Sequence, residues 1–226
     1  MKKNVLIVAA HPDDEVLGCG GTITQLKHEG YDIYTMILGE GITSRDQTRD
    51  VKKRESEIKE LKEQIVQANK ILGVKKVFIY NFPDNRFDSV ALLDIVKKIE
   101  KVKNEVKPEI IFTHFKDDLN IDHKITYKAV ITATRPQKEE TVKTIYSFEV
   151  LSSTEWSYPL CFNPNVFFDI SKTVNNKIKA MSCYKTELRD FPHPRSLKSL
   201  VAIAKRWGTV VGRQYVEAFE LIRKVD

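Results

Sequence analysis

The sequence of 226 residues has few cysteines and no long hydrophobic segment. No apolar run approaches the roughly 20 residues that are needed to cross a bilayer. The cysteines Cys19, Cys161 and Cys183 are an odd number, lie far apart and lack the CxxC spacing of a metal knuckle. Such scattered thiols are typical of reduced cysteines in a cytoplasm. The absences therefore predict a cytoplasmic protein without a membrane span or a disulfide framework.

The chain also lacks repeats, low-complexity tracts and linkers rich in Pro, Gly or Ser. A single domain over residues 1–226 is expected, because a chain of this length can bury a sizeable core. Charged residues make up 30% and hydrophobic residues 42% of the chain, as in ordinary globular proteins. The opening MKKNVLIVAA resembles a signal peptide, but its apolar run is short and continues into HPDDE rather than a cleavage site. We interpret it as a buried strand.

The net charge of +6 does not indicate a nucleic-acid partner. Lysines alternate with glutamates in segments such as VKKRESEIKELKEQ, which is the pattern of a solvated helix face. A small-molecule partner and no nucleic acid are therefore expected, while the oligomeric state stays open, a homo-oligomer included. Binding of a phosphate-type group is left open by four basic residues of the C-terminal part: Arg195, Lys205, Arg206 and Arg213.

Short apolar runs alternate with helical patterns along the first two-thirds of the chain. Runs rich in β-branched and aromatic residues predict strands at 4–10, 32–38, 76–82 and 109–115. Amphipathic segments that end near Gly or Pro predict helices at 15–30, 48–73 and 89–106. This alternation predicts an α/β fold, a Rossmann-like and mostly parallel sheet with helices on both faces.

Beyond Pro136 the pattern changes but continues the same domain. Further strands are expected at 144–150 and 166–170, a helix near 172–184, and a basic tail that adds helical cover. Polar clusters follow each of the first four strands: HPDDE, GEGITSR, PDNRFD and KDDLNIDH. Because ligands bind where parallel strands end, these clusters predict one crevice built from residues far apart in sequence.

Histidines and acids in this crevice predict a metal site. His11 and Asp14 stand at the turn after the first strand, and His123 follows the fourth. Two imidazoles and one carboxylate, with a position left for water, form a hydrolytic zinc centre. Pro12 restricts His11 to an extended conformation, so that His11 and Asp14 can face the same point. Zn²⁺ is the expected metal, and Fe²⁺ is the alternative because such ligands accept both.

The neighbouring acids have other expected roles. Asp13 is free to take a proton from water whose pKa the metal lowers to roughly 7. Acids at a helix N-terminus also interact favourably with the helix dipole, and Glu15 is expected to do only that. Asp122 is either a solvent-facing loop acid or a group that orients a nearby ligand. Helix capping alone does not explain the histidines.

Three segments together resemble a known family. AHPDDE after the first strand, KDDLNIDH after the fourth, and a tail containing YKTEL, PHPRS and YVEAF are similar to the PIG-L/LmbE-like zinc deacetylases, which remove acetyl groups from N-acetylglucosamine-type substrates. The resemblance extends over nearly the whole chain. It implies a Rossmann-like sheet, zinc held by His11, Asp14 and His123, and Asp13 as the general base.

One position departs from the pattern of that family. Many members carry a second histidine three residues before the metal-binding histidine, where this chain has Asn120. An amide can donate a hydrogen bond to an oxyanion but cannot deliver the charge of an imidazolium. The resemblance to members with a tail histidine near the zinc makes His193 the candidate for the acid or stabilising role. Its alternative is a loop histidine between two prolines.

The resemblance also implies residues that bind substrate. Arg54 and Asp84 match positions that bind the sugar in relatives, and such groups suit vicinal hydroxyls. Their structural alternatives are a charged helix for Arg54 and a turn for Asp84. Trp156 and Trp207 are either stacking platforms for a sugar or, as expected for both, buried aromatic residues.

These observations predict an enzyme, a zinc-dependent hydrolase of the amide in an N-acetylated amino sugar or its conjugate. Asp13 would activate water, and His193 or Asn120 would stabilise the tetrahedral intermediate. The alternative is a Rossmann-like sugar- or nucleotide-binding protein without hydrolase activity. GCGG followed by Glu40 suggests a dinucleotide fingerprint, but HPDDE separates the strand from the glycines and its aspartates would repel a pyrophosphate.

Overall fold

A seven-stranded sheet organises the computed structural model, which describes residues 3–226; Met1 and Lys2, part of the expected domain, lie outside the described residues. The order is β3-β2-β1-β4-β5-β7-β6, and β1 to β5 run parallel, whereas β7 is antiparallel to β5 and β6. The strands are β1 Asn4–Ala9, β2 Asp32–Gly39, β3 Lys76–Phe82, β4 Ile110–His114, β5 Thr144–Phe148, β6 Val166–Asp169 and β7 Val216–Lys224.

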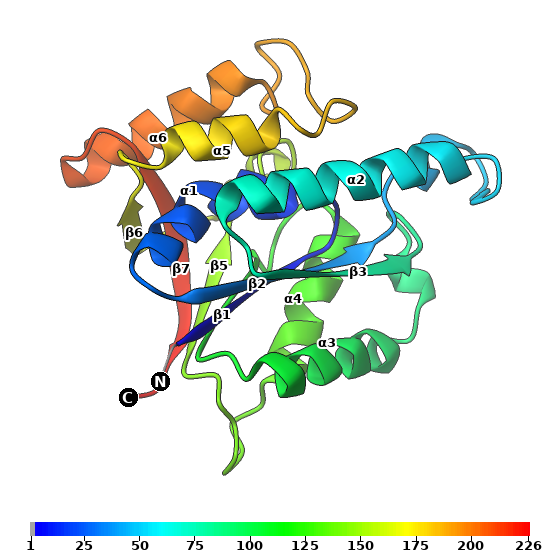
Figure 1. Cartoon of the computed structure of the whole chain (residues 1–226), viewed down its shortest axis with the longest axis horizontal. Helices are drawn as coiled ribbons and strands as arrows, with labels where there is room; N and C mark the ends of the chain where they lie inside the picture. The colour runs from blue at the N-terminus through cyan, green and yellow to red at the C-terminus, as the bar shows by residue number, and fades with distance from the viewer. Residues whose placement is uncertain (1–2) are drawn as a thin grey trace.

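Helices cover both faces of the sheet (Figure 1). On one face lie α1 Asp14–His28, α2 Glu55–Leu72, α5 Val174–Met181 and α6 Leu197–Val211; on the other lie α3 Leu92–Val106 and α4 Ile121–Ala133. Short 3₁₀ helices, η1 Thr43–Arg45, η2 Phe87–Ser89 and η3 Thr154–Trp156, follow the ends of β2, β3 and β5. The predicted single α/β domain with a mostly parallel sheet is confirmed.

The sheet separates two hydrophobic cores. Alternate residues of β1 point to opposite faces, so that Val5 and Ile7 pack under α1 and α2, while Leu6 and Val8 pack against α3 and α4. These β1 side chains are fully buried. A strand buried on both faces reads as a continuous apolar run, which is why its position could be predicted. The opening apolar run is therefore a central strand, as expected.

Some expected boundaries and elements were wrong. The second helix begins at Glu55 rather than near residue 48, and the third begins at Leu92 rather than residue 89. Helix α4 was not among the expected helices. The segment expected as a basic tail contains helix α6 and strand β7, which lies inside the sheet between β5 and β6.

The glycines of GCGG allow α1 to lie close to the sheet. A Cβ atom on Gly18 would lie 2.3 Å from Cδ2 of Phe148, and one on Gly21 would lie 2.8 Å from Ile170. The helix is interrupted at Cys19, where φ is −145°. Close packing thus explains the glycines without a dinucleotide.

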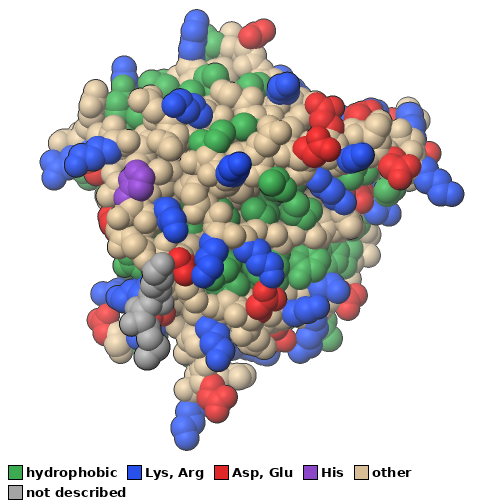
Figure 2. All heavy atoms as spheres, viewed as in Figure 1, with side chains coloured by type: hydrophobic (Ala, Val, Ile, Leu, Met, Phe, Trp, Pro, Cys, Tyr) green, Lys and Arg blue, Asp and Glu red, His purple; other side chains and the backbone are tan. Residues whose placement is uncertain are grey.

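On the face drawn in Figure 2, Lys and Arg side chains are scattered and interspersed with Asp and Glu rather than gathered in one stripe. Within residues 3–226, no helix combines the length and the hydrophobicity that a membrane-spanning segment needs.

Candidate metal centre

Two turns bring the predicted metal ligands together. The chain leaves β1, passes through His11 and Pro12, and enters α1 at Asp14. On the other side, Asn120 caps α4, since its Oδ1 accepts a hydrogen bond of 2.8 Å from the backbone N–H of Asp122. This cap places His123 in the first turn of α4, at the carboxyl edge of the sheet.

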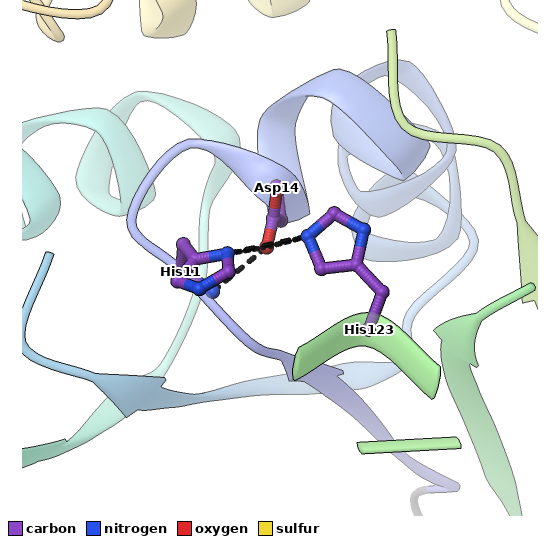
Figure 3. A group of neighbouring side chains, drawn as sticks. All are labelled: His11, Asp14 and His123. Atoms are coloured by element: carbon purple, nitrogen blue, oxygen red, sulfur yellow. Dashed lines mark hydrogen bonds and ion pairs between the residues drawn. The ribbon is translucent and has the colours of Figure 1, made fainter. Parts of the chain in front are cut away.

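The three predicted ligands converge on one point (Figure 3). Nδ1 of His11 lies 3.2 Å from Nε2 of His123 and 3.5 Å from Oδ2 of Asp14, and Nε2 of His123 lies 3.4 Å from the same oxygen. Donors bound at about 2.0–2.1 Å to one tetrahedral ion are about 3.3–3.4 Å apart. The triangle therefore has the dimensions of a site for Zn²⁺ or a similar ion.

The outer nitrogens of both histidines have carboxylate partners. Nε2 of His11 lies 2.9 Å from Oδ2 of Asp122, and Nδ1 of His123 lies 3.1 Å from Oδ1 of Asp118. If each outer nitrogen donates its proton to the carboxylate, the inner nitrogens direct lone pairs toward each other and toward Asp14. Such an arrangement is repulsive without a cation, so the donor set fits a metal.

Electrostatics favour a positive charge at the same point. Burial lowers the pKa of His123, but the nearby carboxylates of Asp14 and Asp118 outweigh burial and raise it to about 9. Burial raises the pKa of Asp14, yet the charges of His123 and His114 outweigh it and lower that pKa well below its ordinary range. The centre thus attracts a cation, which a divalent ion can supply.

A second group of possible ligands shares His11. Its Nε2, a carboxylate oxygen of Asp84 and one of Asp122 all lie within 4.8 Å of one another. The hydrogen bond of 2.9 Å to Asp122 already accounts for the closest of these contacts, whereas Asp84 is 3.5 Å from Nε2. Asp122 also accepts a bond from the Phe87 backbone N–H. These contacts give Asp122 the orienting position anticipated from sequence rather than that of a loop acid.

Two residues of the centre were missed in the sequence. Asp118 is fully buried and accepts hydrogen bonds from the hydroxyls of Ser153 and Thr154. His114 is fully buried at the end of β4, where it stacks on His123 at 4.0 Å and its Nε2 accepts a bond of 2.8 Å from the Ala10 backbone N–H. Asp118 lies within KDDLNIDH, so its proximity to His123 was the available signal; His114 is part of an apolar run and gave none.

Asp13 lies beside the triangle but outside it. Its φ of 96° is in the left-handed region, which an aspartate seldom adopts. The side chain is buried, and Nη1 of Arg195 lies 3.4 Å from its Oδ2. Burial raises the pKa of Asp13 well above its ordinary range, the Asp14 charge adds to this rise, and Arg195 opposes it. A carboxylate with a raised pKa is a better proton acceptor near neutral pH.

A cavity of about 330 Å³ opens above these residues. His11, Asp13, Asp14 and His123 line it together with Leu17. Its polar walls are Ser44, Arg45, Asp84, Asn85, Asn120, Ser152, Ser153, Glu187, Arg189 and Arg195. The predicted residues Asp84 and Asn120 thus lie beside the candidate metal site, and a polar cavity of this size suits a sugar-sized ligand.

Two other predicted residues lie outside the cavity lining. Arg54 precedes α2 and binds carboxylates of its own neighbourhood, with Nε 2.8 Å from Asp46 and Nη1 2.7 Å from Glu57. His193 packs edge-on against Trp156, and its Nδ1 accepts a bond of 3.1 Å from the Arg195 backbone N–H. The His193 ring therefore contacts the cavity lining through the backbone of Arg195 rather than lining the cavity itself.

The tryptophans differ in their surroundings. Trp207 is buried, packs edge-on against Phe162 and at a tilt against Phe167, and donates a hydrogen bond of 2.5 Å to Glu149, so it is a core residue as expected. Trp156 is 41% exposed, contrary to the expectation of a buried aromatic, because it lies on η3 at the surface. Neither lines the cavity.

Comparison with known proteins identifies the family. The sequence profile of PIG-L, described as GlcNAc-PI de-N-acetylase, matches residues 6–134, which is more than half of the chain. The chain therefore belongs to the PIG-L family, and the resemblance found in its motifs is confirmed. De-N-acetylation breaks an amide C–N bond, so the family makes this protein a hydrolase of that class.

Individual relatives extend over most of the chain. The probable N-acetyl-alpha-D-glucosaminyl L-malate deacetylase 2 of Bacillus cereus is 25% identical over 189 residues, which are 83% of this chain and 84% of the relative. Among solved structures, the N,N'-diacetylchitobiose deacetylase of Pyrococcus horikoshii has a TM-score of 0.77 at 21% identity and covers 98% of this chain and 84% of its own.

The same fold also carries another reaction. The 4-carboxy-2-hydroxymuconate hydratase GalB of Pseudomonas putida superposes with a TM-score of 0.75 at 22% identity, covering 99% of this chain and 98% of its own. At such identities the likeness shows the fold alone. The hydrolase class of this chain therefore rests on its family, and the details of its reaction must be argued from its site residues.

Proposed function

We propose that this protein is a zinc-dependent hydrolase that removes the acetyl group from an N-acetylated amino sugar of the N-acetylglucosamine type, or from a conjugate of that sugar. The proposal is carried by the triangle of His11 Nδ1, Asp14 Oδ2 and His123 Nε2, whose residues line a sugar-sized cavity. The compartment we propose is the cytoplasm, because Cys19, Cys161 and Cys183 are all free thiols.

When bound, the divalent ion supplies Lewis acidity, which polarises the acetyl carbonyl and lowers the pKa of water in the site. Asp13, beside the ligands but not among them, takes the proton of the attacking water and returns it to the leaving amine. Asp118 and Asp122 hold the histidine rings through their outer nitrogens, at 3.1 and 2.9 Å.

Two residues are candidates for stabilising the negative charge that develops on the acetyl oxygen. Asn120 lines the cavity and carries an amide donor, which now bonds to Oδ1 of Asn85 at 2.7 Å. His193 lies outside the lining. If His193 fulfils this role, His193→Ala lowers turnover by roughly 10²- to 10⁴-fold with the metal content unchanged. Unchanged turnover assigns the role to Asn120.

We select one partner for substrate hydroxyls among the polar residues of the cavity. Asp84 lines it, and its Oδ2 accepts a hydrogen bond from the Ser44 backbone N–H at 3.0 Å, which fixes the carboxylate. We propose that Asp84 binds hydroxyls of the sugar. For Arg54 the same role requires that its contacts to Asp46 and Glu57 be exchanged for substrate.

Acetate release decides between a deacetylase and a sugar-binding protein. Metal-free protein would be incubated with N-acetylglucosamine, its glycosides and its nucleotide conjugates, alone and after addition of Zn²⁺ or Fe²⁺. A deacetylase releases acetate only with the ion present, and the more active ion indicates the native metal. Binding of sugar without acetate release under every condition would favour the non-hydrolytic alternative.

A further inference from the structure

We propose that Glu15 is a positioning residue for catalysis, which holds Asp13 in its left-handed conformation through the Asp13 backbone N–H. The sequence alone assigned Glu15 only a favourable interaction with the helix dipole. The inference rests on the proposed function, because it concerns the residue that takes the proton from water.

The contacts of Glu15 are those of a buried bridge. Its side chain is fully buried, and its Oε2 accepts a bond of 3.2 Å from the Asp13 backbone N–H. Its Oε1 accepts bonds from the Tyr184 hydroxyl at 2.5 Å and from Nδ2 of Asn69 at 2.9 Å. Tyr184 and Asn69 are themselves buried. Three donors from separate segments thus fix one carboxylate.

A dipole interaction alone does not explain this arrangement. An acid in the first turn of a helix also interacts favourably with the dipole when it is exposed, and exposure avoids the cost of burying the charge. Glu15 is buried and linked to α2 by Asn69 and to the segment after α5 by Tyr184. We therefore infer that the buried Glu15 carboxylate serves to fix the position of the Asp13 backbone.

Hydrogen bonds fix the backbone of Asp13 at both its N–H and its carbonyl group. Its N–H donates to Glu15, and its carbonyl oxygen accepts bonds from the N–H groups of Val16 at 3.0 Å and Leu17 at 2.8 Å. A non-glycine residue with φ of 96° needs such support, because this conformation is strained. The direction of the Asp13 side chain, and hence its distance from the attacking water, follows from the same φ.

Glu15→Gln tests the bridge with little change in shape. The glutamine has one oxygen, so it cannot accept the Asp13 N–H while it serves Tyr184 and Asn69. We expect kcat to fall roughly ten- to a hundredfold, as for a small misplacement of a catalytic group. KM and the metal content should stay within about twofold of the wild type. An unchanged kcat overturns the inference.

The decisive measurement is made in the background Asp13→Asn. If Glu15 acts through the Asp13 carboxylate, adding Glu15→Gln to Asp13→Asn causes no further loss of turnover. A merely structural role lowers turnover by the same factor in both backgrounds and overturns the inference. If Asp13→Asn itself retains full turnover, the proposed function fails instead, so the two failures can be told apart.

Two further variants keep the test conclusive. Tyr184→Phe removes one donor from the Glu15 carboxylate and should lower kcat in the same direction by a smaller factor, again only when Asp13 is present. If Glu15→Gln does not fold, an unchanged kcat in folded Tyr184→Phe overturns the inference. Glu140→Gln is the matched control, because this carboxylate binds Lys103 near the opposite edge of the sheet and should leave turnover unchanged.

Discussion

At the scale of single residues, the adjacent acids Asp13 and Asp14 have different surroundings. Oδ2 of Asp14 faces both histidines, whereas Oδ2 of Asp13 faces Arg195. Asp14→Asn removes a charged ligand, so metal binding and turnover should both fall. Asp13→Asn keeps all three metal ligands, and asparagine tolerates a positive φ, so the metal should stay bound. Turnover should fall by roughly 10²-fold or more, because an amide cannot take the proton of the attacking water.

Metal stoichiometry measured beside the rate of acetate release checks this difference. Loss of the metal in Asp13→Asn together with retention in Asp14→Asn would show that the two roles are reversed. Full activity in both variants would contradict the hydrolase proposal altogether.

A second residue-scale prediction concerns close packing at Gly18. Gly18→Ala puts a Cβ atom 2.3 Å from the buried ring of Phe148, so either α1 or the ring must move. We expect a loss of about 1–3 kcal/mol in the free energy of unfolding, as for overpacked cores. Gly20→Ala is the comparison, because its Cβ atom would lie 3.2 Å from Cγ of Lys177 and 3.3 Å from Cγ1 of Val16, so that a neighbour need yield by only a few tenths of an ångström. Urea unfolding of both variants measures the difference, and equal stabilities would contradict it.

The predictability of the site differed between its residues for physical reasons. His11, Asp14 and His123 could be predicted because an imidazole beside acids at a strand end has few other uses. The environment of Glu15 could not, since its partners Asn69 and Tyr184 lie 54 and 169 residues away in the chain. His193 matches a family position, but the fold turns its ring toward Trp156.

At the scale of elements, the interruption of α1 depends on a buried ion pair. Glu217 of β7 accepts bonds from the backbone N–H groups of Gly21 at 3.0 Å and Thr22 at 2.7 Å, just after the break at Cys19. Lys177 of α5 donates to Glu217 at 2.6 Å and to the Leu17 carbonyl oxygen at 2.7 Å. Three elements therefore meet at the point where α1 changes direction.

Removing one partner of this pair should be costly. Lys177→Met leaves the Glu217 carboxylate buried without its cation, and breaking a buried pair in this way costs about 3–5 kcal/mol. Lys97→Met is the control, because Lys97 pairs with Glu100 on the exposed side of α3 and should change stability by at most about 0.5 kcal/mol. Denaturant unfolding compares the two variants; similar losses would show that the buried pair has no special role.

The elements that the sequence failed to predict have ambiguous local patterns. Helix α4 contains Ile125, Thr126, Val130 and Ile131, and such β-branched residues are typical of strands. Its helical form is determined by the Asn120 cap and by burial against the sheet. The prediction that α2 begins near residue 48 was wrong for a different reason. The segment from residue 48 is charged and has no apolar face to bury before Ile58, so it does not form a stable helix.

At the scale of the whole molecule, the candidate metal site connects the two helical layers that the sheet separates. His11 lies in the turn between β1 and α1 and Asp14 begins α1, while His123 belongs to α4 on the opposite face of the sheet. Asp118 connects His123 further to Ser153 and Thr154 after β5. An ion at the triangle therefore cross-links both helical layers, and its binding energy contributes to the stability of the folded chain.

Removal of the metal should accordingly lower the melting temperature as well as the activity. An ion present at 1,000 times its Kd adds about 4.1 kcal/mol to the stability of the folded state. For a chain of this size each kcal/mol moves Tm by about 2–4 °C, so chelation should lower Tm by roughly 8–16 °C, and added Zn²⁺ should restore it. Asp14→Asn should melt at the same temperature with and without chelator, because this variant lacks the carboxylate that would bind the ion together with the two histidines. Calorimetry of metal-free and reloaded protein gives this comparison, and an unchanged Tm in the wild type would mean that no ion is bound between the two layers.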